Sequence, residues 1–171
     1  MTETSSIQLP VCGLYRTTRP LPGAEAEVGE GALVNFHNHS TPGMPVVLRP
    51  AFNVFNRWSW NAEPIYVRQL SWLDSLHKLP AEGYYALRRE LEFDDGSARW
   101  PKGALVQLGY DRKASPLVFL AQLRHALSEN TLWFAEHGVI LREDQIDLLE
   151  PLSVFEEPDP VTAGGERPAG A

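Results

Sequence analysis

Two histidines, His37 and His39, stand one residue apart in the stretch NFHNHSTPG, and their type and spacing could support metal chemistry. Residues i and i+2 of a β-strand point to one face, so the two imidazoles could chelate a single divalent ion. A hydrolytic metal site needs at least three protein ligands and an open position. Asp111 or another distant carboxylate is the candidate that would complete such a site.

The same stretch, FHNHS, resembles the opening motif of the PHP-type (polymerase and histidinol phosphatase) metal-dependent phosphoesterases. The resemblance implies a strand-borne His-x-His-Ser that begins a metal cluster for the hydrolysis of phosphate esters. It covers only His37, His39 and Ser40, and Asn35 stands where the family commonly has an acidic or polar residue. The family's β/α barrel is also considerably longer than this chain, so we interpret the match as coincidence.

Other reactive groups lack a recognisable partner in the sequence. Cys12 has no neighbouring His or Arg pattern that would mark an activated thiolate, although Arg16 is close in sequence, and is predicted to be a buried or inert cysteine. Glu63 and Glu136 recur in a Trp-x-Ala-Glu element and are predicted to be turn residues. The sequence contains no Gly-rich phosphate loop, nucleophile elbow or paired-cysteine metal knuckle.

The chain repeats itself, and the repeat identifies the elements that must position these residues. The matching pairs, in chain order, are GLYRTTR (13–19) with GYYALRR (83–89), GALV (31–34) with GALV (103–106), WNAE (60–63) with WFAE (133–136), and SWLDSL (71–76) with DQIDLL (144–149). We interpret the chain as a tandem duplication with its boundary near residues 82–83. The counterparts of His37 and His39 are then Gly109 and Asp111, so the fold does not require the histidine pair.

Each copy has the sequence pattern of several short strands and one short helix. The segments ALVNFHN and ALVQLGY alternate apolar and polar residues with a period of two, which indicates a half-buried strand. Apolar runs in PVVL, RWSW and IYV, and in PLVFL, TLWF and VIL, predict three more strands per copy, and GLYRTTR and GYYALRR predict the first. Ser71 and Asp144 are predicted to cap a helix of about two turns in each copy.

About five strands and one helical turn per copy predict an all-β protein with minor α content, in which each copy is a small SH3-like or OB-like β-barrel. The alternative is one barrel or sandwich built from both copies. The predicted organisation is a flexible segment (1–9), barrel repeat 1 (10–82), barrel repeat 2 (83–157) and a disordered Pro/Gly/Ala-rich tail (158–171).

Tryptophans divide into matched and unmatched positions. Trp60 and Trp133 are equivalent and are predicted to anchor the two cores. Trp72 and Trp100 have no aromatic counterpart and are predicted, with His37 and the neighbouring histidine, to face a partner, because large aromatic side chains dominate protein interfaces.

Composition restricts the class of partner. The net charge is −7 over 171 residues and the basic residues are scattered, which argues against a nucleic-acid backbone as main partner. The first ten residues carry no signal-peptide pattern, no apolar run is long enough to span a membrane, and the single Cys12 fits a reducing compartment. We therefore expect a soluble, cytoplasmic protein.

These observations favour a non-enzymatic protein-binding or assembly module built from two duplicated β domains, without a cofactor. Its partner would be another protein or a larger complex, and the sequence leaves a homo-oligomer open. The alternative hypothesis is a metal-dependent, phosphoesterase-like hydrolase that uses His37 and His39 as ligands of a divalent metal.

Overall fold

The computed structural model describes residues 9–41, 43–93, 99–123 and 131–153. In these ranges the chain consists mostly of β-strands, and its only helical elements are two 3-10 helices, η1 (Leu70–Ser75) and η3 (Glu143–Leu148). The predicted all-β class with minor helix is therefore confirmed. The two terminal segments predicted to be flexible, 1–9 and 158–171, lie outside the described residues, except for Leu9, which is the first residue described. No helix in the described part of the chain is long and apolar enough to cross a membrane.

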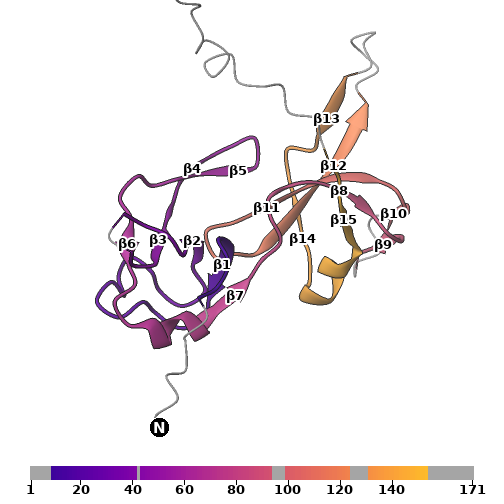
Figure 1. Ribbon diagram of the computed structural model, residues 1–171. Helices are drawn as coiled ribbons and strands as arrows, with labels where there is room; N and C mark the ends of the chain where they lie inside the picture. The colour runs from indigo at the N-terminus through magenta and orange to yellow at the C-terminus, as the bar shows by residue number, and fades with distance from the viewer. Residues whose placement is uncertain (1–8, 42, 94–98, 124–130, 154–171) are drawn as a thin grey trace, which may run out of the picture.

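The first half forms a five-stranded antiparallel sheet, the first sheet, with strand order β6-β3-β2-β1-β7 (Figure 1). Its strands are β1 (Gly13–Thr17), β2 (Leu33–His37), β3 (Val46–Leu48), β6 (Ile65–Tyr66) and β7 (Leu76–Lys78). A separate hairpin, β4 (Pro50–Val54) with β5 (Arg57–Trp60), leaves the sheet between β3 and β6.

The second half forms a second antiparallel sheet with order β13-β12-β11-β8-β15, and β14 also pairs with β12. Its strands are β8 (Gly83–Leu87), β11 (Leu105–Tyr110), β12 (Pro116–Leu123), β13 (Leu132–Phe134), β14 (Val139–Ile140) and β15 (Leu149–Pro151). The short strands β9 (Leu91–Glu92) and β10 (Arg99–Trp100) form a two-stranded sheet beside it.

The two sheets follow the same path and the same register. Tyr15 lies opposite Val34 in the first sheet, as Tyr85 lies opposite Val106 in the second. In each half a 3-10 helix leads into the last strand, which returns to pair with the first strand. The edge strands β6 and β7 are not paired with each other, and neither β13 nor β14 is paired with β15. The closed barrel predicted for each copy is therefore not found within the described residues.

Tyr15 and Tyr85 make the same hydrogen bond in the two halves. Each hydroxyl donates at 2.7 Å to the carbonyl oxygen four residues earlier, on Val11 and on Ala81. Burial raises the pKa of both phenols, so both remain protonated donors at neutral pH.

We expect Tyr15→Phe and Tyr85→Phe each to lower the free energy of unfolding by about 1 kcal/mol, because each removes one such hydrogen bond without changing the ring. Urea denaturation of the two variants measures this. A loss confined to one of them would contradict an equivalent role for the two tyrosines.

The two short helices lie where the sequence predicts them, but their ends differ from the prediction. Ser71 lies inside η1. The N-cap residue of this helix is Gln69, whose side chain makes no capping hydrogen bond. In η3 the backbone N–H of Arg142 donates at 2.9 Å to the Gln145 side chain. The predicted capping by Ser71 and by Asp144 is therefore wrong, because each helix begins one residue before the predicted cap.

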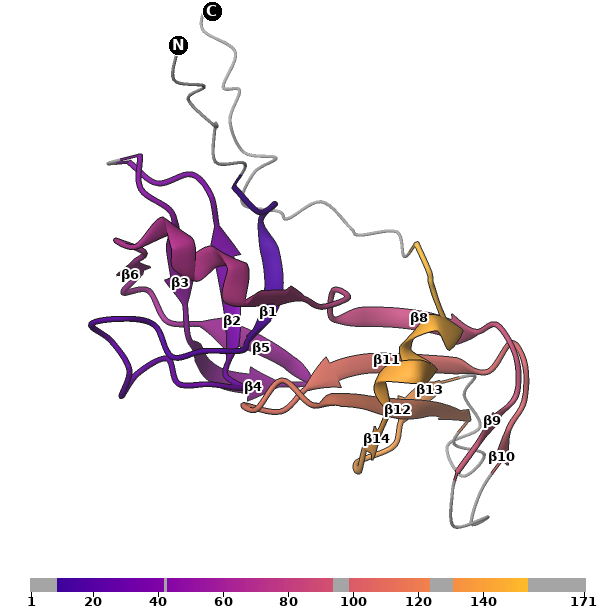
Figure 2. The same cartoon turned by 90° about the horizontal axis from the view of Figure 1, so that it is seen from below.

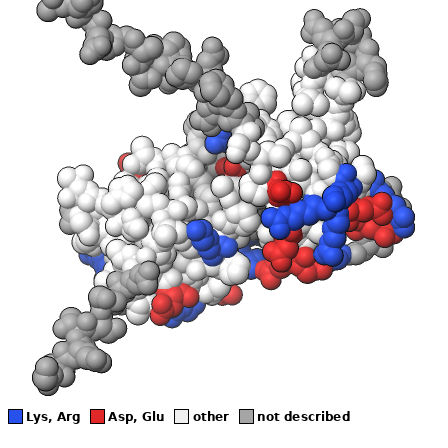
Figure 3. All heavy atoms as spheres, turned by 45° about the vertical axis from the view of Figure 1, so that its right-hand side comes forward, with Lys and Arg blue, Asp and Glu red and all other residues white. Residues whose placement is uncertain are grey.

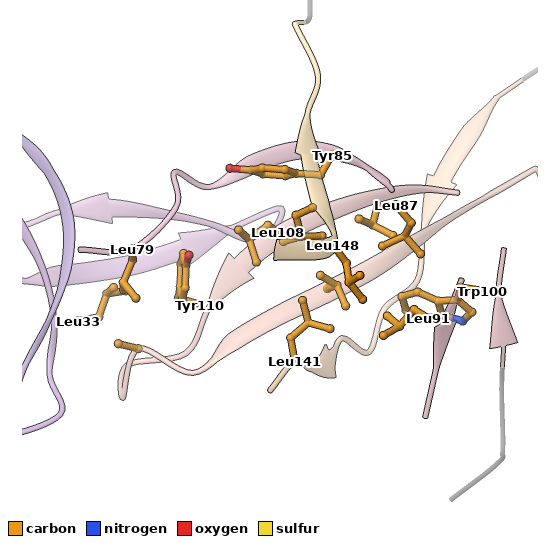
Figure 4. Close-up of a cluster of buried hydrophobic side chains, with 14 residues drawn as sticks. Leu33, Leu79, Tyr85, Leu87, Leu91, Trp100, Leu108, Tyr110, Leu141 and Leu148 are labelled. Carbon is orange, nitrogen blue, oxygen red and sulfur yellow. The ribbon is translucent and has the colours of Figure 1, made fainter. Parts of the chain in front are cut away.

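Two clusters of buried side chains form the core. The first cluster belongs to the first sheet and contains Tyr15, Leu21, Val28, Val34, Phe36, Val47, Val67, Trp72 and Leu73. The second cluster is larger and extends into the first half, since it includes Leu33 and Leu79, which lie beside Tyr110 at one end of it (Figure 4). Trp58 and Trp60 from β5 pack against the same cluster. The two sheets therefore share part of one core.

The β4–β5 hairpin joins the two sheets at strand β11 (Figure 2). At its tip, the Asn56 side chain donates to Gln107 Oε1 at 3.0 Å, and Gln107 Nε2 donates to the carbonyl oxygen of Phe55 at 2.7 Å. Gln107 is only 4% exposed, so these bonds satisfy a buried amide. Phe55 and Asn56 both have positive φ, at 50° and 62°, as a type I′ hairpin turn requires. Positive φ is rare for phenylalanine, and the contact with Gln107 holds this turn in place.

Candidate functional site

Strand pairing brings a thiol to the two histidines. Gly13 on β1 faces Phe36 on β2, so the preceding residue, Cys12, lies at the level of His37. The ligand atoms of Cys12, His37 and His39 all lie within 4.8 Å of one another. The two imidazole rings are 5.8 Å apart and meet edge to face. The structure thus adds a sulfur ligand to the pair found in the sequence.

Asn38 orients two members of this cluster. Its Oδ1 lies 3.2 Å from the Cys12 sulfur and 3.1 Å from Nδ1 of His39. Its backbone N–H points to the same sulfur at 3.4 Å, and its side-chain Nδ2 donates at 3.1 Å to the carbonyl oxygen of Pro10. The last bond fixes which end of the amide faces the thiol and the imidazole.

Cys12 also lines an open cavity of about 420 Å³ between the first sheet and the segment that leads to β8. Glu82 lies in the wall of this cavity, together with Arg57 and Lys78. Burial raises the pKa of the Glu82 carboxyl, while the N–H of Trp58, which donates to Oε2 at 3.1 Å, acts in the opposite direction. The buried Oε1 has no hydrogen-bond partner among the described residues.

Asp111, the carboxylate considered as a third ligand, does not join the histidines. Its Oδ1 accepts the backbone N–H groups of Lys113 and Ser115, at 2.9 and 2.8 Å, and so closes the turn between β11 and β12. Cys12 is exposed and not buried, and the fold gives it a histidine neighbour that the sequence did not show, since its sulfur lies 3.4 Å from Nδ1 of His39. Counting the register of the predicted strands 13–17 and 33–37 is the signal that could have found this contact.

Trp72 and Trp100, predicted to face a partner, are core residues. Trp72 is 2% exposed, and its indole N–H donates at 3.2 Å to the carbonyl oxygen of Arg19. Trp100 is 9% exposed and packs edge to face against Phe93 at 4.9 Å. Because each contributes to a local core, neither offers a partner a usable surface. The two matched tryptophans do not anchor the two cores as predicted. Trp60 packs against the second cluster and not against the core of its own half, and Trp133 is exposed.

A second candidate surface, absent from the sequence-based predictions, lies on the second sheet. Strand register places one set of side chains on the face opposite the second core cluster, which we call the outer face. Its exposed or half-exposed apolar members are Tyr84, Leu123, Leu132, Phe134 and Ile140. Tyr84 and Phe134 stack with ring centroids 5.4 Å apart, which confirms that β8 and β13 present them on the same side.

The outer face continues to the tip of the β4–β5 hairpin. A pocket of about 230 Å³ lies there, lined by Asn53, Asn56, Trp58, Gly109, Tyr110, Asp111, Leu117 and Phe119. Leu117 pairs with Ile140, so the pocket borders the exposed apolar set. Phe55 at the hairpin tip is itself largely exposed.

Charge is absent from the strands that form most of this face. Strands β12, β13 and β14 contain no charged residue. Figure 3 shows Lys, Arg, Asp and Glu gathered in the lower part of the view, while the part above them is almost free of charge. Ion pairs in the described residues include Arg16 with Glu143 and Arg99 with Glu92.

Comparison of the chain with protein-family models, with curated proteins and with solved structures gives no match. The function proposed below is therefore inferred from the geometry of these residues.

Proposed function

We propose that this chain is a non-enzymatic protein-binding or assembly module and that the outer face of the second sheet is its contact surface. The observation that carries the proposal is the exposure of large apolar side chains on one uncharged face, with Leu132 at 54% and Ile140 at 63%. Large apolar side chains that are exposed on one face mark protein contacts, because leaving them in water is unfavourable. Tyr84 and Phe134 add an aromatic pair, the type of side chain that supplies most binding energy at interfaces.

The partner in this proposal is a different protein. Within the chain, the β4–β5 hairpin already covers one part of β11 and needs Gly109 there, because a Cβ at that position would lie 2.7 Å from the carbonyl oxygen of Asn56. In the first sheet, His37 occupies the position that Gly109 occupies in the second sheet. The β12–β13 hairpin of a second copy, which is the equivalent of β4–β5, could therefore not pack against the first sheet as β4–β5 packs against β11. A partner with its own apolar surface fits the exposed strands better.

The proposed module consists of two SH3-like units that arose by tandem duplication. Four ordered sequence matches support this, together with the common strand order of the two sheets. Equivalent backbone bonds support it too: Gly31 N–H donates to Thr17 at 2.8 Å, and Gly103 N–H donates to Leu87 at 2.7 Å. Duplication explains how a short chain acquired two similar surfaces that then diverged, one toward apolar contact and one toward the histidines.

A metal-dependent hydrolase that uses His37 and His39 is the alternative function. Cys12 supports this alternative because it supplies a third ligand, and it also lines a cavity. Hydrolysis also needs a substrate site and a group that activates water. We place the binding role first because the apolar face is the more extensive feature.

The test is affinity capture with the double variant Leu132→Asp, Ile140→Asp. Both side chains are exposed, so we expect the free energy of unfolding to change by no more than about 0.5 kcal/mol. Capture from the native cell with the wild-type chain should retain a partner. The amount of partner retained by the double variant should be at least about tenfold lower. Quantitative mass spectrometry of the bound fraction is the measurement.

Val11→Asp is the matched control, since Val11 is an equally exposed apolar residue in the first half. It should retain the partner. Retention by the double variant would remove the outer face from the proposal. Light scattering of the purified chain tests whether the partner is a second copy. A wild-type dimer that becomes a monomer in the double variant would show that it is.

A further inference from the structure

We infer that Cys12, His37 and His39 form a binding site for Zn²⁺, distinct from the apolar outer face. One thiolate and two imidazoles are the ligand types that zinc takes in proteins, whereas Mg²⁺ and Ca²⁺ prefer oxygen ligands. The set lies at one end of the first sheet, where Cys12 precedes β1 and His37 ends β2. The site has no part in the proposed contact surface, so either can fail without the other.

The spacing of the ligand atoms is close to what zinc needs. Zinc–sulfur and zinc–nitrogen bonds of about 2.0–2.3 Å place tetrahedral ligand atoms about 3.5 Å from one another. The three ligand atoms already lie within 4.8 Å of one another, so rotation of the side chains that moves these atoms by about 1 Å completes the geometry. The backbone beneath them need not move, because Gly13 and Phe36 hold β1 and β2 in register.

Asn38 supplies the surroundings that a zinc site requires. Histidines that ligate a metal usually donate their other ring N–H to a neighbouring acceptor, which fixes the tautomer. Oδ1 of Asn38 lies 3.1 Å from Nδ1 of His39, where it would accept the N–H of the tautomer that binds a metal through Nε2. The Asn38 backbone N–H lies 3.4 Å from the Cys12 sulfur and is in position to donate to it. Binding replaces the thiol proton with a zinc–sulfur bond and releases that proton to solvent.

The second sheet contains an internal comparison. By register, Glu82 and Gly109 occupy the positions that Cys12 and His37 occupy in the first sheet. Gly109 has no ligand atom, and Asp111, the counterpart of His39, accepts backbone bonds of its own turn. The ligand set therefore belongs to one sheet only, and the common fold does not explain it.

Three protein ligands leave one zinc position open. His39 and Cys12 are exposed, so water reaches this position directly. A water molecule or a side chain from a partner protein can occupy it. The site is thus suited to a zinc ion that reacts with, or is shared with, a second molecule.

Titration of Co²⁺ into the reduced, metal-free chain tests the inference. Co²⁺ takes the same ligands as zinc and reports a bound thiolate through a charge-transfer absorption band. We expect one ion per chain, displaced by Zn²⁺ and unaffected by Mg²⁺. Cys12→Ser should abolish the charge-transfer band, and His37→Ala and His39→Ala should each weaken binding at least about tenfold.

His77→Ala is the matched control, because His77 is an exposed histidine on β7 outside the ligand set. It should bind Co²⁺ as the wild type does, and circular dichroism should show every variant folded. Absence of saturable one-to-one binding would overturn the inference. So would an unchanged charge-transfer band in Cys12→Ser, or a loss in His77→Ala equal to that in His37→Ala.

Discussion

Replacing Trp58 with alanine is expected to lower the free energy of unfolding by about 3 kcal/mol, the low end of the range for a packed tryptophan. Trp58 lies on the hairpin of the first half but packs against the second core cluster. Its indole N–H donates at 2.7 Å to the carbonyl oxygen of Tyr110. Alanine would leave a gap in the shared core and an unpaired carbonyl group.

Arg112 adds to the expected loss. Its guanidinium lies 5.0 Å from the centre of the Trp58 ring and donates to the carbonyl oxygens of Pro50 and Ala51, at 3.1 and 2.9 Å. The ring covers one face of the cation and so helps to hold it against the hairpin. Without the indole, we expect the hairpin to separate more easily from β11.

Urea denaturation of Trp58→Ala, Trp58→Phe and Phe52→Ala measures the effect and assigns it. Trp58→Phe keeps an aromatic ring and loses the indole hydrogen bond, so about 1 kcal/mol should be lost. Phe52 is an exposed residue of the same hairpin, and its replacement should cost less than about 0.5 kcal/mol. Equal losses for Trp58→Ala and Phe52→Ala would mean that the hairpin does not join the two sheets.

Gly109→Ala is expected to destabilise the chain by about 1–3 kcal/mol, although it adds a single methyl group. The added Cβ would lie 2.7 Å from the backbone oxygen of Asn56, a contact that real Cβ atoms do not make. Backbone cannot rotate away as a side chain can. The hairpin tip would have to lift from β11 and loosen its hydrogen bonds to Gln107.

Gly29→Ala is the matched control for this substitution. Its Cβ would meet only the carbonyl oxygen of Glu25, at 3.8 Å, an ordinary contact. We expect no loss of stability there, because alanine reduces the conformational entropy of the unfolded chain. Thermal denaturation of the two variants gives the comparison, and a Gly109→Ala variant as stable as Gly29→Ala would disprove the close approach of the hairpin.

Local pattern was sufficient for five strands in each half and missed β4, β7, β9, β10 and β15. The alternation of apolar and polar residues in residues 33–37 and 105–110 identified β2 and β11, because a strand with one buried face must have a period of two. The ordered repeats identified the equivalent first strands and the sites of both short helices in the same way. The pattern also placed His37 on the side away from the first core cluster, which holds Phe36.

Local pattern failed where a second segment decides what covers a face. Trp72 and Trp100 were assigned to a surface because they lack counterparts, yet packing buries both. Trp133 has a counterpart and is nevertheless exposed, on a strand that, within the described residues, pairs only with the end of β12. Periodicity shows which residues share a face and carries no information on what lies against it.

The sequence by itself therefore determined five strands in each half, their order along the chain and the histidine pair, all of which depend on neighbours along the chain. Only the tertiary structure placed Cys12 beside His37, set the hairpin against Gly109 and left Leu132 and Ile140 uncovered. Each of these depends on contacts between residues far apart in sequence. Such contacts are fixed by strand register and by close packing of whole elements, and these act only once the chain has folded.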